Sequence, residues 1–165
     1  MPPEGRQPGK STMLRLIAAL CCATLLSGCF FLGGGGSGPA SYNGYVQRSG
    51  MYLASWDVDN SCISPKLQRV IDSFERRFGR KIVVSSGYRD PIRNIIGGGT
   101  ESSHHMNCEA VDFFIPGVSK SNLIAYAMGN PLVGGLGCYS GRSFIHVDVR
   151  DRPRGYRKPV TFSGC

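Results

Sequence analysis

The stretch Ser102–Phe114 reads S-S-H-H-M-N-C-E-A-V-D-F-F and places His105 seven residues before Asp112. Its last residues alternate, so that Ala110 and Asp112 share one face of an extended segment. The pattern predicts a loop that carries His105 and a strand that carries Asp112. Neutral imidazole and carboxylate are both zinc ligands, so the two side chains are candidate metal ligands. The alternative is an exposed loop whose histidines bind nothing.

A third ligand is expected at His146, because two ligands are too few for a zinc site and the chain has only three histidines. His146 lies in Ser143–Val149, S-F-I-H-V-D-V, whose alternation predicts a strand. The two-residue period puts His146 and Asp148 side by side on one face of that strand.

The first predicted helix begins at Ser64 and Pro65, since serine caps helices and proline suits their first turn. It is expected to end near Gly79. Its apolar stripe follows the helical spacing i, i+3, i+4 and i+7, with Leu67, Val70, Ile71 and Phe74 as members.

Further elements are predicted along the chain: a buried strand over 81–85, a second helix over 119–128 and a glycine-rich strand over 134–139. Residues 42–59 are expected to form a strand or to wrap around the domain. The tail, 150–165, is basic and contains proline, and it is expected to wrap over the surface.

Arg89 follows the first predicted strand in the sequence S-G-Y-R-D-P, in which Gly87 permits a sharp turn. Two interpretations stand. Arg89 is either a surface residue paired with Asp90, or a guanidinium that binds a substrate carboxylate or a developing oxyanion.

Residues 1–28 are predicted to be a lipoprotein signal peptide, with a basic beginning and an apolar segment too short for a comfortable transmembrane helix. The sequence L-S-G-C, which ends at Cys29, resembles the bacterial lipobox and implies cleavage before Cys29 and lipidation of that residue. An ordinary secretory signal with an incidental cysteine is the alternative. The start is either Met1 or Met13.

Residues 29–43 are expected to comprise the lipidated cysteine and a flexible Gly/Ser tether, followed by a folded domain over 44–165. Phe30, rather than Asp, follows the cysteine. By analogy with Gram-negative sorting, this favours the outer membrane, with the domain facing the periplasm.

The formal net charge is +8, and it falls to +6 when residues 1–28, with three Lys/Arg and one Glu, are removed. A moderately basic surface suits an anionic partner such as cell wall or phospholipid. No long run of Lys and Arg alternates with aromatic residues, so nucleic acid is not an expected partner. The length of 165 residues allows one domain, which is expected to be a monomer.

Four cysteines follow Cys29, at Cys62, Cys108, Cys138 and Cys165. An even number in an exported protein predicts two disulfides, for which three pairings are possible. We favour Cys108–Cys138, together with Cys62–Cys165. Ligation of zinc by cysteine is less favoured, because the chain has no C-x-x-C pair.

Three motifs in order, S-G-Y-R at 86–89, S-x-H-x-x-x-x-A-x-D at 103–112 and F-I-H-V-D at 144–148, resemble the zinc D-alanyl-D-alanine peptidases. This is the VanX/VanY-like and hedgehog-like fold group, and the nearest branch resembles the YcbK-type murein endopeptidases. The resemblance spans roughly residues 61–156. It implies an α+β fold in which a small antiparallel sheet has helices packed on one side.

The resemblance also implies roles for individual residues. His105, Asp112 and His146 would be the zinc ligands. Ser103 would order the loop before them, and Arg89 would contact the substrate or stabilise the transition state.

The catalytic base is not settled by the resemblance. Several relatives carry an acidic residue three positions before the last histidine, where this chain has Ser143. Asp148 is the remaining candidate, and it would either accept the proton of the zinc-bound water or only orient a ligand imidazole. His104 is a lesser candidate, while Glu101 and Glu109 are expected to be solvated.

These expectations point to a zinc peptidase that hydrolyses amide bonds in peptidoglycan stem peptides or cross-links, either as a murein endopeptidase or as a DD-carboxypeptidase. The alternative is a non-catalytic, zinc-containing lipoprotein that binds cell wall or a partner protein. The motifs do not separate an endopeptidase from a carboxypeptidase, because that depends on whether the groove is open at both ends.

Overall fold

The computed structural model describes residues 41–165. The predicted signal peptide over 1–28, Cys29 and nearly all of the tether lie outside the described residues. Within 41–165, the helices are too short or too polar to cross a membrane.

Helix α2, Pro65–Phe78, is the first predicted helix. The Ser64 hydroxyl accepts a hydrogen bond from the Leu67 N–H at 3.2 Å, and Gly79 ends the helix in a left-handed conformation with φ of 62°. Phe74 packs edge-on against Phe113 of the sheet with ring centroids 4.9 Å apart. The whole apolar stripe is buried, so it fixes α2 against the sheet.

Seven strands form one sheet in the order β1-β2-β3-β4-β6-β5-β7. The strands are β1 Val46–Arg48, β2 Met51–Leu53, β3 Val83–Ser86, β4 Ala110–Phe114, β5 Gly135–Gly137, β6 Ile145–Asp148 and β7 Val160–Phe162. The strands predicted over 81–85, 134–139 and 143–149 are confirmed with changed ends. Residues 42–59 form the antiparallel hairpin of β1 and β2.

The α+β class is confirmed, but the sheet is mixed rather than antiparallel. Strand β2 runs parallel to β3, because α2 lies between them in the chain and carries it back to the same end of the sheet. Strand β7 runs parallel to β5. The tail therefore joins the sheet, whereas the sequence predicted that it only wraps the surface.

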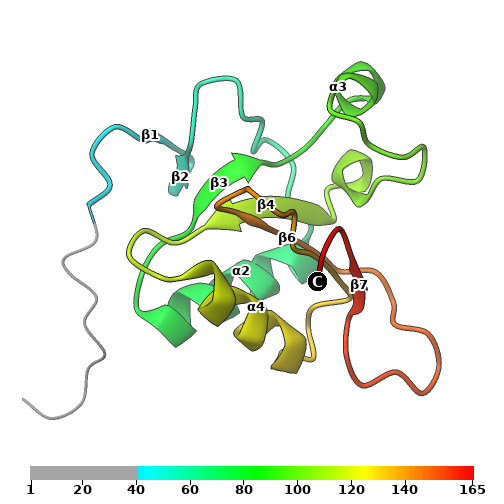
Figure 1. The fold of residues 1–165 in the computed structure, drawn as a ribbon. Coiled ribbons are helices and arrows are strands. Elements are labelled where there is room, and N and C mark those ends of the chain that lie inside the picture. The colour runs from blue at the N-terminus through cyan, green and yellow to red at the C-terminus, as the bar shows by residue number, and fades with distance from the viewer. Residues whose placement is uncertain (1–40) are drawn as a thin grey trace, which may run out of the picture. The chain divides into compact units, whose positions relative to one another are not determined.

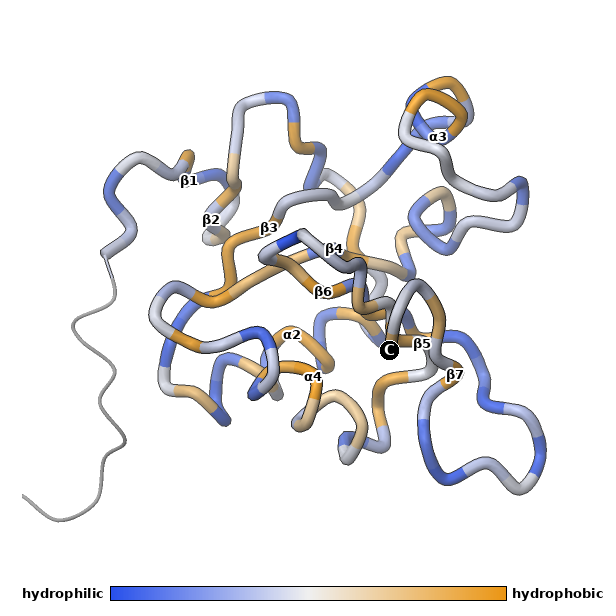
Figure 2. The backbone as a smooth tube through the Cα atoms, viewed as in Figure 1, coloured by the Kyte–Doolittle hydropathy of each residue, from blue (hydrophilic) through white to orange (hydrophobic). Residues whose placement is uncertain are grey.

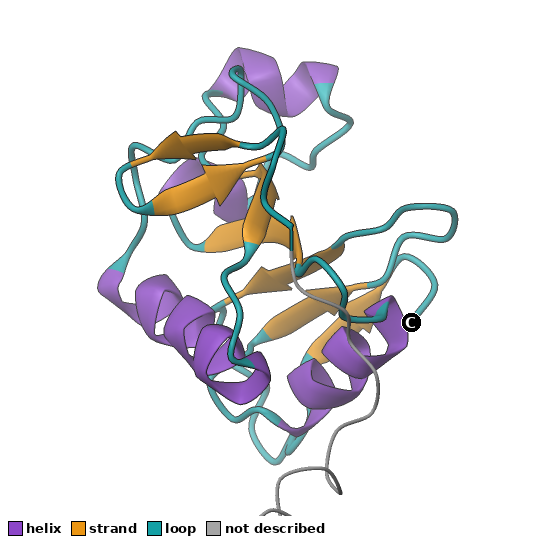
Figure 3. Ribbon diagram, turned by 90° about the vertical axis from the view of Figure 1, so that its left-hand side faces the viewer, coloured by secondary structure: helices purple, strands orange, loops and turns teal. Residues whose placement is uncertain are grey.

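Helices α2 and α4 lie together on one face of the sheet (Figures 1 and 3). Helix α4, Lys120–Gly129, is the predicted second helix and is capped by Ser119. The Tyr126 hydroxyl donates to the Ser73 carbonyl at 3.1 Å, which ties α4 to α2. Apolar residues follow the central strands and these two helices (Figure 2). The core thus occupies this side of the sheet.

The other side of the sheet carries α3, Pro91–Ile96, and the 3-10 turn η1, His104–Asn107 (Figure 1). Both belong to the connection between β3 and β4. The residues of the predicted site therefore lie on the face that α2 and α4 leave free.

The disulfides are Cys62–Cys108 and Cys138–Cys165, so the favoured pairing of Cys108 with Cys138 and of Cys62 with Cys165 is wrong. Cys108 lies beside the start of α2, where its carbonyl accepts a hydrogen bond from the Ser64 N–H at 2.9 Å. Cys62 is therefore its neighbour. Cys138 follows β5, and the parallel strand β7 brings Cys165 next to it.

Candidate metal centre

The register of β4 and β6 places Asp112 directly opposite His146 and Ala110 opposite Asp148. Val111 and the other intervening residues belong to the buried core on the opposite face. Directly opposed residues on one face have Cβ atoms about 4.5–5.5 Å apart. The sheet alone therefore brings two predicted ligands together, and the prediction that His146 and Asp148 share a face is confirmed.

His105 reaches the same place from η1, the turn that precedes β4. Its Nδ1 donates to the Gly87 carbonyl at 2.7 Å, and its own carbonyl accepts from the Arg89 N–H at 3.3 Å. Cys108 ends η1 in a left-handed conformation with φ of 60° and is bonded to Cys62. The loop that carries His105 is thus fixed by hydrogen bonds and by a covalent link.

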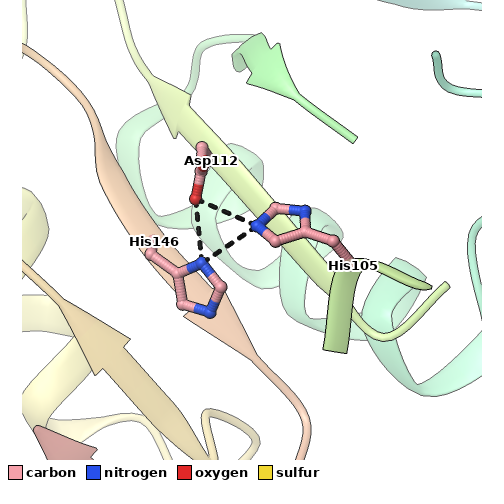
Figure 4. A group of neighbouring side chains, drawn as sticks. All are labelled: His105, Asp112 and His146. Atoms are coloured by element: carbon pink, nitrogen blue, oxygen red, sulfur yellow. Dashed lines mark hydrogen bonds and ion pairs between the residues drawn. The ribbon is translucent and has the colours of Figure 1, made fainter. Parts of the chain in front are cut away.

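The three predicted ligands converge on one point (Figure 4). His146 Nδ1 lies 2.8 Å from Asp112 Oδ1, His105 Nε2 lies 3.3 Å from the same oxygen, and the two nitrogens are 3.2 Å apart. The residues are only 3–5% exposed. Within the described residues, they form a group whose donor atoms could hold one metal ion.

The outer hydrogen bonds of the two imidazoles assign their protons. A carbonyl oxygen only accepts, so Nδ1 of His105 carries the hydrogen that faces Gly87, and Nε2 keeps its lone pair. The Asp148 carboxylate likewise takes the Nε2–H of His146 at 3.2 Å and leaves Nδ1 with its lone pair.

Two nitrogen lone pairs and the Asp112 carboxylate oxygen therefore face one another within 3.3 Å. They repel unless a cation lies among them. Such a cation is either a proton on His146 or a metal ion. Two imidazoles and one carboxylate, each fixed by an outer hydrogen bond, match the donors of a catalytic zinc site, so the residues fit the metal.

Arg89 binds the second oxygen of Asp112, with Nη2 and Oδ2 2.8 Å apart. Its Nε donates to the Ser86 hydroxyl at 2.8 Å. Arg89 is thus bonded to Asp112 in the cleft rather than to Asp90. Asp90 instead accepts hydrogen bonds from two backbone N–H groups at the start of α3.

Asp148 is fully buried, and both of its oxygens are engaged. Oδ1 accepts from Arg150 Nε at 2.9 Å, and Oδ2 accepts from Arg150 Nη2 at 2.5 Å and from His146 Nε2 at 3.2 Å. Of the two roles considered for Asp148, this geometry favours orientation of the His146 ring.

The pKa values of these groups follow from their contacts. Burial raises the pKa of the Asp112 carboxyl, but its contacts with the His105 and His146 rings outweigh burial and hold that pKa below its ordinary value. Burial likewise raises the pKa of Asp148, and the bonds with His146 and Arg150 reverse the effect. Burial lowers the pKa of His146, but its two carboxylate partners raise it above its ordinary value.

The glycines of strand β5 allow other side chains to pack closely beside the centre. Gly135 lies opposite Asp148, and Gly137 lies opposite His146. A Cβ at Gly135 would lie 2.3 Å from Asp148 Oδ2, and a Cβ at Gly137 would lie 2.7 Å from the Phe162 ring. The glycines of the predicted strand therefore leave room for the buried carboxylate and for the ring that covers His146.

The candidate ligands lie in a cleft of about 730 Å³. Its walls include residues 97–100 and 102–105, together with residues of the turn 139–144 and of strand β7. Ser103 lines the cleft without a hydrogen bond from its side chain to the turn, and its carbonyl accepts from the Met106 N–H at 3.1 Å. The order that Ser103 gives to this loop therefore comes through its backbone.

Several residues of the cleft were not predicted from the sequence, namely Tyr139, Arg142, Arg150 and Phe162. Arg150 continues the alternation of His146 and Asp148 by one more step, and this pattern could have pointed to it. Tyr139 and Phe162 carry no such pattern, because they reach the cleft through a turn and through the parallel strand β7.

Two lining groups can carry a proton outside the metal group. His104 Nδ1 lies 3.0 Å from Glu109 Oε2, so the carboxylate takes the Nδ1–H and Nε2 is free to accept a proton. Glu109 was expected to be solvated. Its side chain is partly exposed, but it also forms a hydrogen bond with His104. Burial raises the pKa of Tyr139, and the Asp112 carboxylate raises it further, so the phenol keeps its hydrogen.

Comparison with known protein families assigns the chain to a class. The family model described as Peptidase M15 matches residues 44–148, and the chain belongs to this family of peptidases. Peptidases of this family depend on zinc, and the His105, Asp112 and His146 group could bind it. A search of curated proteins found no match, and a search of solved structures found none either.

Proposed function

We propose that the chain is a zinc peptidase that hydrolyses amide bonds in peptidoglycan stem peptides or their cross-links. One observation carries the proposal. Three buried side chains direct their potential metal-binding atoms to one point on the wall of a cleft, and an outer hydrogen bond fixes each side chain. Membership of the Peptidase M15 family supports hydrolysis of a peptide bond. The peptidoglycan substrate is supported by the resemblance of the three sequence motifs to D-alanyl-D-alanine peptidases.

A zinc ion held by His105 Nε2, Asp112 Oδ1 and His146 Nδ1 would supply a Lewis acid for the scissile carbonyl and would lower the pKa of a water molecule. The protein fixes the three donor atoms through the Gly87 carbonyl, Arg89 and Asp148, which hold the opposite side of each ligand.

Asp148 acts by positioning in this proposal. Its oxygens are occupied by Arg150 and His146, it is fully buried, and its lowered pKa makes it a weak base. His104 is better suited to take up a proton, because it lines the cleft and Glu109 holds its Nδ1–H. Its free Nε2 can then accept a proton and pass it to the leaving amine.

The test is incubation of the zinc-loaded chain with purified peptidoglycan sacculi, followed by mass analysis of the soluble fragments. A chelator and the variant His146→Ala should both abolish release. The masses of the fragments separate an endopeptidase, which cuts cross-links, from a carboxypeptidase, which releases terminal D-alanine. Intact muropeptides after incubation with the zinc-loaded wild type would refute the proposal.

A second function has one specific observation in its favour. Ser143 stands where several relatives carry an acidic base, and Asp148 is committed to Arg150. The alternative is a non-catalytic zinc-containing lipoprotein that binds cell wall or a partner protein. Sacculus binding that survives Asp148→Ala and His146→Ala, with no cutting by the wild type, would favour it.

The proposal includes lipidation of Cys29 and attachment to the outer membrane, with the domain facing the periplasm and acting as a monomer. The lipobox-like sequence before Cys29 supports the anchor. Incorporation of labelled palmitate that is lost in Cys29→Ser, together with membrane fractionation, tests the anchor and the location. Unlabelled wild-type chain would exclude the anchor.

A further inference from the structure

We propose that Arg142 forms a subsite for a carboxylate of the substrate at the mouth of the cleft. This inference rests on the proposed peptidase function, which it deepens by naming the chemical group that the enzyme recognises beside the scissile bond.

The positive charge in the cleft comes from arginine side chains. Three guanidinium groups line it, those of Arg89, Arg142 and Arg150. Arg89 is paired with Asp112, and Arg150 is paired with Asp148. The Arg142 side chain is exposed and makes no hydrogen bond or ion pair within the part of the chain that the structure describes. The cleft therefore offers a ligand one uncommitted cation.

The turn between β5 and β6 fixes the backbone of Arg142. The Arg142 N–H donates to the Tyr139 carbonyl at 3.1 Å, and Gly141 takes a φ of 75°. Lys120 Nζ donates to the carbonyls of Tyr139 and Arg142, each at 2.8 Å. The base of the side chain is thus held in place, while its charged end is free to meet a ligand.

Lys120 also adds to the positive potential of this turn. It binds two neutral carbonyls, and within residues 41–165 no carboxylate pairs with it. Two positive charges without acidic partners therefore lie at the turn that carries Arg142. Among the described lining residues, the only carboxylate is that of Asp112, which Arg89 and the two histidines already engage.

The residues around Arg142 indicate the chemistry of the ligand. The Tyr139 and Phe144 rings lie 5.6 Å apart and form an aromatic wall beside Arg142. A guanidinium binds a carboxylate through two parallel hydrogen bonds. A peptide could therefore place an apolar side chain on the wall and a carboxylate on Arg142. In a peptide substrate, that group is either the C-terminal carboxylate or a side-chain carboxylate, and the experiment must separate the two.

The test measures binding, so it requires no cleavage. The full chain is stripped of metal and titrated by calorimetry with a synthetic stem pentapeptide that ends in D-Ala-D-Ala. Two analogues are compared with it, one with an amidated C-terminus and one with amidated side-chain carboxylates. One amidation should weaken binding about tenfold, the scale of a lost charge-assisted hydrogen bond. The analogue that loses affinity identifies the group.

Variants then link the loss to Arg142. Arg142→Gln should weaken binding of the free-acid peptide by the same factor. It should leave unchanged the binding of the amidated analogue that lost affinity for the wild type. Arg142→Lys should restore part of the affinity for the free-acid peptide. Arg154→Gln is the matched control, because Arg154 is exposed and lies outside the cleft lining. Its affinity should equal that of the wild type.

Three results would overturn the subsite: equal binding of all three peptides, no detectable binding, or equal weakening of acid and amide peptides by Arg142→Gln. The subsite and the peptidase function fail separately. Carboxylate discrimination without release from sacculi would leave the subsite in a binding protein. Release from sacculi without discrimination would leave a peptidase without this subsite.

Discussion

The substitution Asp148→Asn tests whether this residue positions His146 or takes a proton. The change keeps the size of the side chain but replaces one acceptor oxygen with an NH₂ group. Asp148 accepts hydrogen bonds from His146 and from Arg150, so one of these donors would then face another donor. The Nε2–H of His146 loses a charged partner, and the ring is held less firmly.

The magnitude follows from these contacts. Loss of a hydrogen-bonded carboxylate behind a ligand imidazole costs about 10–100-fold in metal affinity, or about 1.4–2.8 kcal/mol. The metal-free fold should lose about 1–3 kcal/mol for the unsatisfied donor. The loss should stay below the cost of breaking a fully buried ion pair, because the Arg150 side chain is 31% exposed and can be rehydrated.

The assay is a competition between the protein and a chromophoric chelator for zinc, together with urea unfolding of the metal-free chain. Asp151→Asn is the control, because the Asp151 side chain is 97% exposed and pairs only with Lys66. It should change neither quantity measurably. With enough zinc to saturate the site, Asp148→Asn should regain most of the wild-type activity on sacculi.

The opposite pattern would refute the positioning role. If Asp148→Asn bound zinc as tightly as the wild type but lost about 10²–10⁴-fold in rate at saturating zinc, Asp148 would be the general base. Equal losses in the Asp151→Asn control would show that the change in net charge, rather than the contact with His146, is responsible.

Further predictions concern the strands, the disulfide and the pH dependence. Gly135→Ala should destabilise the fold by about 1–3 kcal/mol in a urea titration and should weaken zinc binding, because its Cβ would lie 2.3 Å from the buried Asp148 carboxylate on β6. Gly129→Ala is the control, and it should be nearly neutral because the space around its Cβ is open. Replacing Cys62 and Cys108 by serine should cost about 2–4 kcal/mol and lower zinc affinity, and unchanged affinity would show that the disulfide does not hold the ligand loop. The raised pKa of His146 should stabilise the metal-free chain fully below about pH 6.5, and this contribution should be lost as the pH rises through the folded-state pKa. Zinc needs the neutral ring, so its affinity should fall at low pH, and urea midpoints without and with zinc should show opposite slopes.

The elements that the sequence predicted well depend on local patterns. Helix α2 followed from its cap at Ser64 and from its apolar spacing, and both are properties of neighbouring residues. The convergence of Asp112 and His146 followed from a two-residue period in each strand, combined with a shortage of histidines. Pairing of the strands in register supplied the rest.

The contacts that the sequence did not reveal are those that only the topology creates. The pairing of Cys138 with Cys165 depends on β7 returning parallel to β5, and the short segment 160–162 lies in a basic, proline-containing tail that gives little sign of a strand. The partner of Arg89 likewise depends on how β3 lies beside β4. The role of Asp148 depends on its ion pair with Arg150. The alternating pattern extends to Arg150, but alternation alone does not indicate an ion pair.

The register of β4 and β6 also gives the metal a part in selecting the folded state. A slip of one residue between these strands would turn one of them over, so that Asp112 and His146 would no longer share a face. Misregistered chains would lack the site. Zinc would therefore bind only chains that paired these strands correctly and would shift the population toward them by mass action. Metal uptake during refolding should therefore report correct pairing of these strands, because the ion would select chains in the native register.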